Sequence, residues 1–97
     1  MSQNKFFLNI LSPAKKIFSG EVLSLVAPGE IGSLGVLANH APLITTLVKG
    51  PIIFRKENEE TIKLQLKKEG FLEVVNNKAT LLVDSLEEDV PNPTSKS

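Results

Sequence analysis

Apolar and polar residues alternate along several short stretches of this chain. Within residues 61–67, the apolar side chains Ile62, Leu64 and Leu66 are separated by polar ones. Successive side chains of a β-strand point to opposite faces of a sheet, so this segment is predicted to be a strand with one buried face and one wet face. The segment 78–84 shows the same period of two.

Shorter apolar runs, rich in branched residues, indicate further strands. These are expected at residues 6–11, 21–26, 32–37, 43–48, 52–56 and 70–75. Turn-forming residues separate them, at Ser12-Pro13, Ser19-Gly20, Pro28-Gly29, 49–51, 57–60 and Asn76-Asn77. This spacing predicts an all-β fold, a flattened antiparallel β-sandwich or barrel of about 8–10 short strands, with no C-terminal helical domain.

The first expected strand carries apolar groups on both of its faces. Phe7 and Leu11 fall on the side opposite to Phe6, Leu8 and Ile10. A strand with two apolar faces inside so small a chain suggests that a partner covers one of them.

The length of 97 residues fits one domain. We expect this β-domain to occupy residues 1–86. Residues 87–97 contain acidic residues, Pro91 and Pro93, and end in small polar residues, so a flexible tail is expected there.

Composition excludes several classes of function. Eleven basic residues balance eleven acidic ones, so no net field favours nucleic acid. The chain has no Cys, which excludes a thiolate metal site and a cysteine nucleophile, and its one His cannot build a metal site alone. We expect no cofactor. No run approaches the ~20 apolar residues of a membrane-spanning helix, so no direct insertion into a membrane is expected.

Two patterns suggest chemistry but have simpler explanations. Gly29, Gly32 and Gly35 recur at every third position, yet a phosphate-binding loop lies between a strand and a helix, and here another strand is expected to follow. His40 has no Asp near it in sequence to orient an imidazole base. We therefore interpret the glycines as residues of tight turns or of close backbone packing, interpret His40 as a structural or interface residue, and predict no catalytic residues.

Longer segments resemble a known family. Phe18-Ser19-Gly20, the segment GSLGVLANHAPLI at 32–44, Lys49-Gly50, and the segments 70–74 and 77–84 are together similar to the N-terminal β-sandwich domain of the F-type ATP synthase epsilon subunit. The resemblance covers residues 5–86.

This resemblance implies a non-catalytic rotor subunit of the central stalk, which fastens the gamma subunit to the c-ring so that ion-driven rotation is coupled to ATP synthesis. Such a subunit lies at the cytoplasmic face of a bacterial inner membrane or, as the less favoured alternative, at a plastid thylakoid membrane, attached through the complex. The matching positions place the gamma interface at Phe18, His40, Ala41, Pro42 and Leu43. They place the c-ring interface at Glu30, Ile31, Gly32, Ser33 and Leu34.

The sequence departs from the family pattern at three places, and each departure limits which family properties can be expected of this chain. Ser33 stands where many relatives have an acidic residue, so the charged contact with the ring is expected either to be lost or to move to Glu30. The segment 66–70 lacks the usual Gly-rich approach to the last hairpin. The two C-terminal helices found in many members have no counterpart in this sequence, so neither ATP binding nor inhibition by that route is expected.

Two other readings compete with the resemblance. One is a free β-sandwich module that binds a peptide or carbohydrate, although the chain has no Trp or Tyr on which to stack a sugar. The other is a small enzyme that uses His40.

Overall fold

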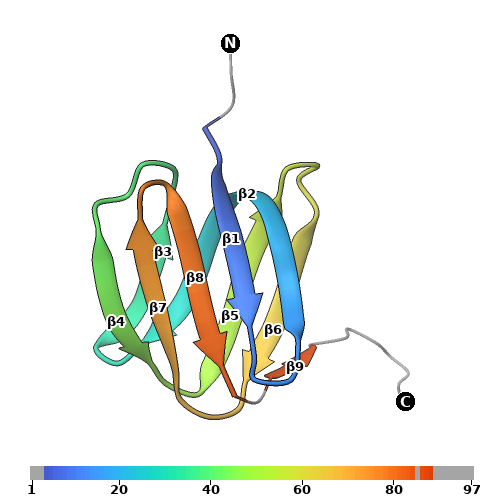
Figure 1. Ribbon diagram of the computed structural model, residues 1–97, viewed down its shortest axis with the longest axis vertical. Coiled ribbons are helices and arrows are strands. Elements are labelled where there is room, and N and C mark those ends of the chain that lie inside the picture. Colours follow the sequence, from blue (N-terminus) through green and yellow to red (C-terminus); the bar gives the residue numbers. More distant parts are fainter. Residues whose placement is uncertain (1–3, 85, 89–97) are drawn as a thin grey trace.

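The computed structural model describes residues 4–84 and 86–88, and this part of the chain consists of strands joined by short turns (Figure 1). The strands are β1 (Phe6–Leu11), β2 (Lys16–Gly29), β3 (Gly32–Val36), β4 (Leu43–Leu47), β5 (Gly50–Lys56), β6 (Thr61–Leu66), β7 (Gly70–Val75), β8 (Lys78–Val83) and β9 (Leu86–Glu88). They form a two-layered β-sandwich, which confirms the expected all-β class.

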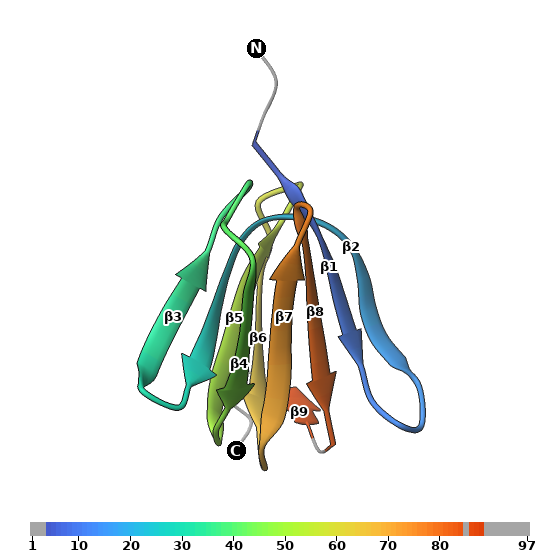
Figure 2. The ribbon, with the colours of Figure 1, turned by 60° about the vertical axis from the view of Figure 1, so that its left-hand side comes forward.

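Strand β2 belongs to both layers. Its first half pairs with β1, and its second half lies between β3 and β5. An irregularity in the β2–β5 register between Val22 and Ser24 marks the change of sheet, and Figure 2 shows β2 arching over one end of the sandwich. A single long strand thus joins the two layers through the backbone.

The prediction of a turn at Ser19-Gly20 is therefore wrong. Ser19 pairs with Asn9 and Gly20 pairs with Leu8, inside the β1–β2 ladder. Gly and Ser favour turns when considered locally, but here a complete partner strand satisfies their backbone groups.

The first layer has the order β2-β1-β8-β7-β4, and the second has the order β3-β2-β5-β6-β9. All pairs are antiparallel except β1 and β8, which run parallel. The parallel pair departs from the purely antiparallel arrangement expected from the sequence. The one pair between β2 and β4, Gly29 with Leu47, closes the sandwich at a corner.

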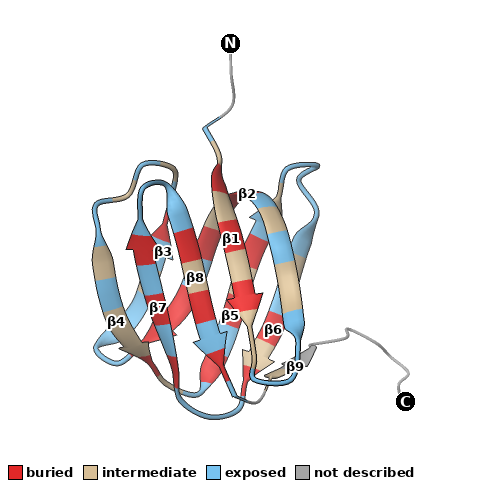
Figure 3. Ribbon diagram, in the orientation of Figure 1, coloured by how far each residue is buried: buried red, intermediate tan, exposed pale blue. Residues whose placement is uncertain are grey.

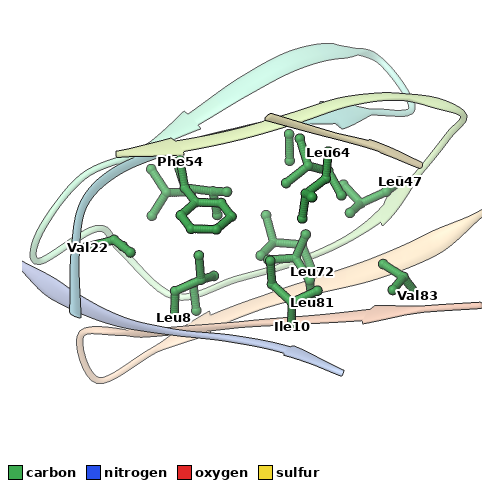
Figure 4. Close-up of a cluster of buried hydrophobic side chains, with 14 of the residues drawn as sticks. Leu8, Ile10, Val22, Leu47, Phe54, Leu64, Leu72, Leu81 and Val83 are labelled. Carbon is green, nitrogen blue, oxygen red and sulfur yellow. The ribbon is translucent and has the colours of Figure 1, made fainter. Parts of the chain in front are cut away.

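The core lies between the layers and follows the period-two pattern (Figure 3). On β1, Phe6, Leu8 and Ile10 are at most 2% exposed, while Phe7 and Leu11 are half-buried on the other face. Figure 4 shows side chains of both layers meeting, among them Phe54 from β5 and Leu81 from β8. Within the described part of the chain, no polar or charged side chain is buried. Burial of apolar area therefore supplies most of the stability.

The chain end differs from the expectation. The proposed tail, 87–97, begins within β9, which pairs with the outer edge of β6. Residues 89–97 lie outside the described residues. No helix in the described residues is long and apolar enough to cross a membrane.

Candidate docking surfaces

A six-residue loop, 37–42, connects β3 to β4 and carries three of the five residues expected to contact gamma. Ala41 and Pro42 are exposed, and His40 is half-buried. The His40 Nδ1–H group donates to the Ala41 carbonyl oxygen at 2.7 Å, which fixes the ring against the loop backbone. The loop thus presents a compact surface of small apolar groups beside one imidazole.

The next two residues divide between core and surface. Leu43, the fourth expected contact, starts β4 and packs against the core. Ile44 follows it, and its side chain is 75% exposed. Because side chains of a strand alternate, Ile44 rather than Leu43 continues the surface of loop 37–42.

Phe18, the fifth expected contact, lies elsewhere. It pairs with Ile10 near the end of β1 and packs on the Phe54 ring, with 4.6 Å between ring centroids and an interplanar angle of 44°. Loop 37–42 lies instead beside the start of β1, where Asn77 contacts both Asn39 and Lys5. The structure does not bring Phe18 and His40 together.

The outer surface of the first layer carries apolar side chains, of which the sequence prediction found only Phe7 and Leu11. We call this surface the outer apolar face; it consists of Phe7, Leu11, Ile44, Phe71, Val75 and Leu82. Phe71 pairs with Leu82, and Leu82 pairs with Leu11, so one row of this face crosses three strands. Phe71 is 55% exposed and Leu82 is 50% exposed. Exposed apolar patches of this kind mark sites of protein interaction.

The row of Phe71, Leu82 and Leu11 ends in a shallow groove of about 510 Å³, lined also by Pro13 of the β1–β2 turn. The two carboxylates that line it are those of Glu69 and Asp84. A signal for this face existed in the sequence, since Phe71 and Val75 occupy the polar phase of an otherwise alternating strand. The same signal was noticed at Phe7 and Leu11.

The segment expected to meet the c-ring, 30–34, forms the turn between β2 and β3. Ile31 at its tip is fully exposed, with a relative exposure of 102%, and Glu30 and Ser33 are exposed beside it. Gly32 adopts φ of +146°, a value that other residues rarely adopt. Leu34 turns back and packs against the core. An apolar tip thus stands beside one carboxylate.

Backbone hydrogen bonds hold the base of this turn to β4. The Glu30 amide donates to the Thr46 carbonyl oxygen at 3.2 Å, and the Val48 amide donates to the Pro28 carbonyl oxygen at 2.9 Å. Because β3 runs from this turn to loop 37–42, the two candidate surfaces lie at opposite ends of one five-residue strand, about 15 Å apart.

Charged pairs surround the β5–β6 turn, which was expected at 57–60. Glu59 contacts Arg55 at 3.7 Å, and Glu60 contacts Lys56 at 3.3 Å. Glu57 accepts a hydrogen bond from Lys5, and this carboxylate raises the pKa of the Lys5 ammonium above its ordinary value of 10.5. All these side chains are substantially exposed, so each pair contributes little to stability.

Nothing in the described part of the chain resembles a catalytic or metal-binding arrangement. No group of three or more His, Asp or Glu side chains there is placed to hold a metal ion. The one hydrogen bond recorded for the His40 ring is to a backbone carbonyl, which supplies neither a nucleophile nor a second titrating group.

The family model that describes the β-sandwich domain of the ATP synthase delta/epsilon chain matches residues 5–89. The chain belongs to this family. The ATP synthase epsilon chain of Leptospira interrogans is 41% identical over 92 residues, which make up 93% of this chain and 71% of the relative. The ATP synthase epsilon chain of Pelotomaculum thermopropionicum is 46% identical over 90% of this chain and 63% of its own length. Family membership confirms the resemblance inferred from the segments at 18–20 and 32–44.

Solved structures share the family's fold. A chain of the Euglena gracilis mitochondrial ATP synthase, in a structure of its OSCP, F1 and c-ring, superposes with a TM-score of 0.81 at 17% identity. The match covers 88% of this chain and 54% of that one. A chain from the central stalk and c-ring of the Tetrahymena thermophila enzyme gives a TM-score of 0.73, also at 17% identity, over 91% of this chain and 69% of that one.

Proposed function

We propose that this chain is a non-catalytic subunit of the central stalk of an F-type ATP synthase, and that it fastens the gamma subunit to the c-ring. The epsilon chains among its relatives and the stalk structures that share its fold support this assignment. They favour it over a free module that binds a peptide or carbohydrate. In a bacterial cell, such a subunit sits at the cytoplasmic face of the inner membrane and is held there through the complex.

The observation that carries the proposal is the separation of two exposed surfaces along β3. One end presents the Ile31 tip, and the other presents loop 37–42, which continues into Ile44 on the outer apolar face. A subunit that joins two partners needs two such surfaces on one rigid body. A rigid β-sandwich core between them transmits force without changing shape.

We assign the gamma subunit to loop 37–42 together with the outer apolar face. This modifies the interface expected from the resemblance, because Leu43 and Phe18 face the core whereas Ile44, Phe71 and Leu82 face outward. Large apolar side chains at the centre of an interface carry most of its binding energy. The gamma surface opposite them should accordingly be apolar.

We assign the c-ring to the turn at 30–34. Its exposed Ile31 and Glu30 offer one apolar and one acidic contact, and no acidic residue stands at position 33. Glu30 therefore takes the role that an acidic residue at position 33 has in many relatives. A positive charge, that of Lys49, follows β4 close to the base of this turn. The salt dependence of c-ring binding by variants of Glu30 and Lys49 therefore shows which sign of charge the ring presents.

The test measures binding of the purified chain to the gamma subunit of its own organism. Ile44→Asp places a charge on the outer apolar face, and Val26→Asp is the matched control, since Val26 is a 37%-exposed strand residue of the second layer. We expect Ile44→Asp to weaken binding about 100-fold or more, the loss typical of a buried interface position that receives an unpaired charge. Val26→Asp should leave the affinity within about threefold of the wild type.

Equal losses in the two variants would exclude the outer apolar face as the gamma site. No binding by the wild type would count against the stalk assignment as a whole. A third variant, Ile31→Asp, should bind gamma normally and bind the isolated c-ring more weakly. This result would separate the two surfaces.

A further inference from the structure

Three segments that are distant in sequence meet at the turn between β7 and β8. The Asn77 side chain donates from Nδ2 to the Lys5 carbonyl oxygen at 2.9 Å, and its Oδ1 accepts from the Asn39 backbone amide at 2.7 Å. The Asn77 backbone carbonyl also accepts from the Phe7 amide at 3.2 Å. One residue thereby connects the start of β1, the last hairpin and loop 37–42.

The turn conformation gives Asn77 this position. Asn76 and Asn77 have φ values of +52° and +58°, as the two central residues of a type I′ hairpin turn require. This turn aims the Asn77 amide group away from its own hairpin and toward the neighbouring segments. A short amide with one donor group and one acceptor group satisfies both at once.

The other hydrogen bonds of loop 37–42 join the loop to itself. The His40 amide donates to the Leu37 carbonyl oxygen at 3.2 Å, and the His40 ring bonds the Ala41 carbonyl oxygen at 2.7 Å. Ala38 packs against the core, but Leu37 is 64% exposed, and Asn39 adopts a positive φ of 65°. The 2.7 Å bond from the Asn39 amide to Asn77 therefore ties the loop to another segment, at the residue before His40.

We propose that Asn77 is a positioning residue, which fixes loop 37–42 in the conformation that docks the gamma subunit while making no contact with gamma itself. The inference rests on the proposed function, because it assumes that the loop is part of the gamma interface. A loop already ordered before binding loses less conformational entropy on docking. Removing its anchor should therefore weaken docking without altering the docking residues.

Two glycine variants test this with the turn preserved. Asn77→Gly deletes both side-chain hydrogen bonds and keeps a residue that adopts positive φ without strain. Asn76→Gly is the matched control, since it makes the same exchange one position earlier in the same turn. A third variant, Asn77→Asp, keeps an oxygen acceptor for the Asn39 amide and loses the donor to the Lys5 carbonyl.

Amide hydrogen exchange in the free chain measures the loop directly. In Asn77→Gly, we expect the Asn39 amide to exchange about fivefold faster or more, the size of effect expected for one lost hydrogen bond. The exchange rates of core amides, such as that of Leu72, serve as the internal reference. These rates should change equally in both glycine variants. In Asn77→Asp, the Asn39 amide should keep its protection.

Affinity for gamma is then measured at a temperature where every variant is folded. We expect Asn77→Gly to bind about fivefold more weakly, and Asn76→Gly and Asn77→Asp to bind like the wild type. A purely structural role for Asn77 would lower the unfolding midpoint but would not produce this pattern of affinities.

The outcomes separate the two claims. Faster Asn39 exchange with unchanged affinity in Asn77→Gly would overturn the positioning role while leaving gamma docking intact. Unchanged Asn39 exchange would overturn it at the first step. Failure of the wild type to bind gamma would instead overturn the proposed function, and the docking part of this inference with it.

Discussion

Phe71 and Leu82 face each other across β7 and β8 on the solvent side of the first layer, and both remain at least half exposed. Their immediate neighbours Leu72 and Leu81 form a similar pair on the inner side and are fully buried. Two adjacent apolar pairs thus serve different purposes. The inner pair contributes to the core, and the outer one is available to a partner.

This difference predicts that substitutions at neighbouring positions destabilise the chain to different extents. Phe71→Ser should lower the free energy of unfolding by no more than about 1 kcal/mol, the range for exposed cross-strand pairs. Leu72→Ala should lower it by about 2–5 kcal/mol, because it leaves a cavity in the core. Urea denaturation measures both. A loss above 2 kcal/mol in Phe71→Ser would mean that the outer pair supports the fold rather than a partner.

A second prediction concerns Phe18. It packs on Phe54 from the inner side of β2, so Phe18→Ala should destabilise the chain by about 2 kcal/mol. The folded fraction should bind gamma with wild-type affinity, because the ring is distant from His40. Thermal unfolding gives the first quantity and binding at low temperature gives the second. An affinity loss of tenfold or more at full folding would restore Phe18 to the interface.

A third prediction uses two glycines of the β2–β3 hairpin. A Cβ atom at Gly29 would lie 2.7 Å from both the Gly32 carbonyl oxygen and the Leu34 Cδ2 atom. Gly29→Ala should therefore cost about 1–3 kcal/mol of stability and disturb the Ile31 tip. At Gly35, the nearest atom is the Leu25 carbonyl oxygen at 4.0 Å, so Gly35→Ala serves as the control.

Calorimetry on the two glycine variants gives the comparison. We expect the Gly35→Ala midpoint to stay within a few degrees of the wild type, since the added methyl group makes only an ordinary van der Waals contact. Equal destabilisation in both variants would mean that backbone flexibility, rather than the close contact at Gly29, governs this hairpin.

A fourth prediction concerns pH. The Lys5 pKa is raised in the folded chain by Glu57, so the folded state holds this proton more tightly than the unfolded state does. The stabilisation is then fully present below the unfolded pKa of about 10.5 and is lost as the pH rises through the higher folded value. Lys5→Gln should thus be less stable than the wild type at pH 8.

The difference in free energy of unfolding between Lys5→Gln and the wild type should shrink to nothing as the pH is raised above 10.5. Unfolding curves at pH 8 and at successive alkaline values measure it, with Lys78→Gln as a control at a position that has an exposed lysine. A difference in free energy of unfolding that stays constant across this pH range would show that the Lys5–Glu57 contact makes no electrostatic contribution.

Local pattern was sufficient to predict some strands and not others. The bounds of β1 and β7 match the expected segments because each is an apolar-rich run followed by turn residues, Ser12-Pro13 after β1 and Asn76-Asn77 after β7. Strand β9 was missed because three residues with one apolar side chain are too short to show a period. The parallel pairing of β1 with β8 depends on contacts between residues about 70 positions apart, and no local pattern records such contacts.

The candidate site was predictable to a similar extent. The resemblance, rather than a local pattern, pointed to the segments 30–34 and 40–43. The inward direction of Leu43 and Phe18 could not be predicted, because it depends on which face of each strand meets the core. The role of Asn77 was also beyond sequence reasoning, which recognised its turn propensity but not the segments that fold against it.

The orientation of β3 has a mechanical consequence. If the c-ring grips the turn at one end of β3 and gamma grips the loop at the other, a pull between them acts along the strand axis. The covalent backbone of β3 then carries the tension, and the β2–β3 ladder, which includes Leu25 with Val36 and Gly29 with Gly32, keeps the strand extended. A strand that is already extended has little length left to give. The sandwich therefore keeps its two attachment points at a nearly fixed separation under load.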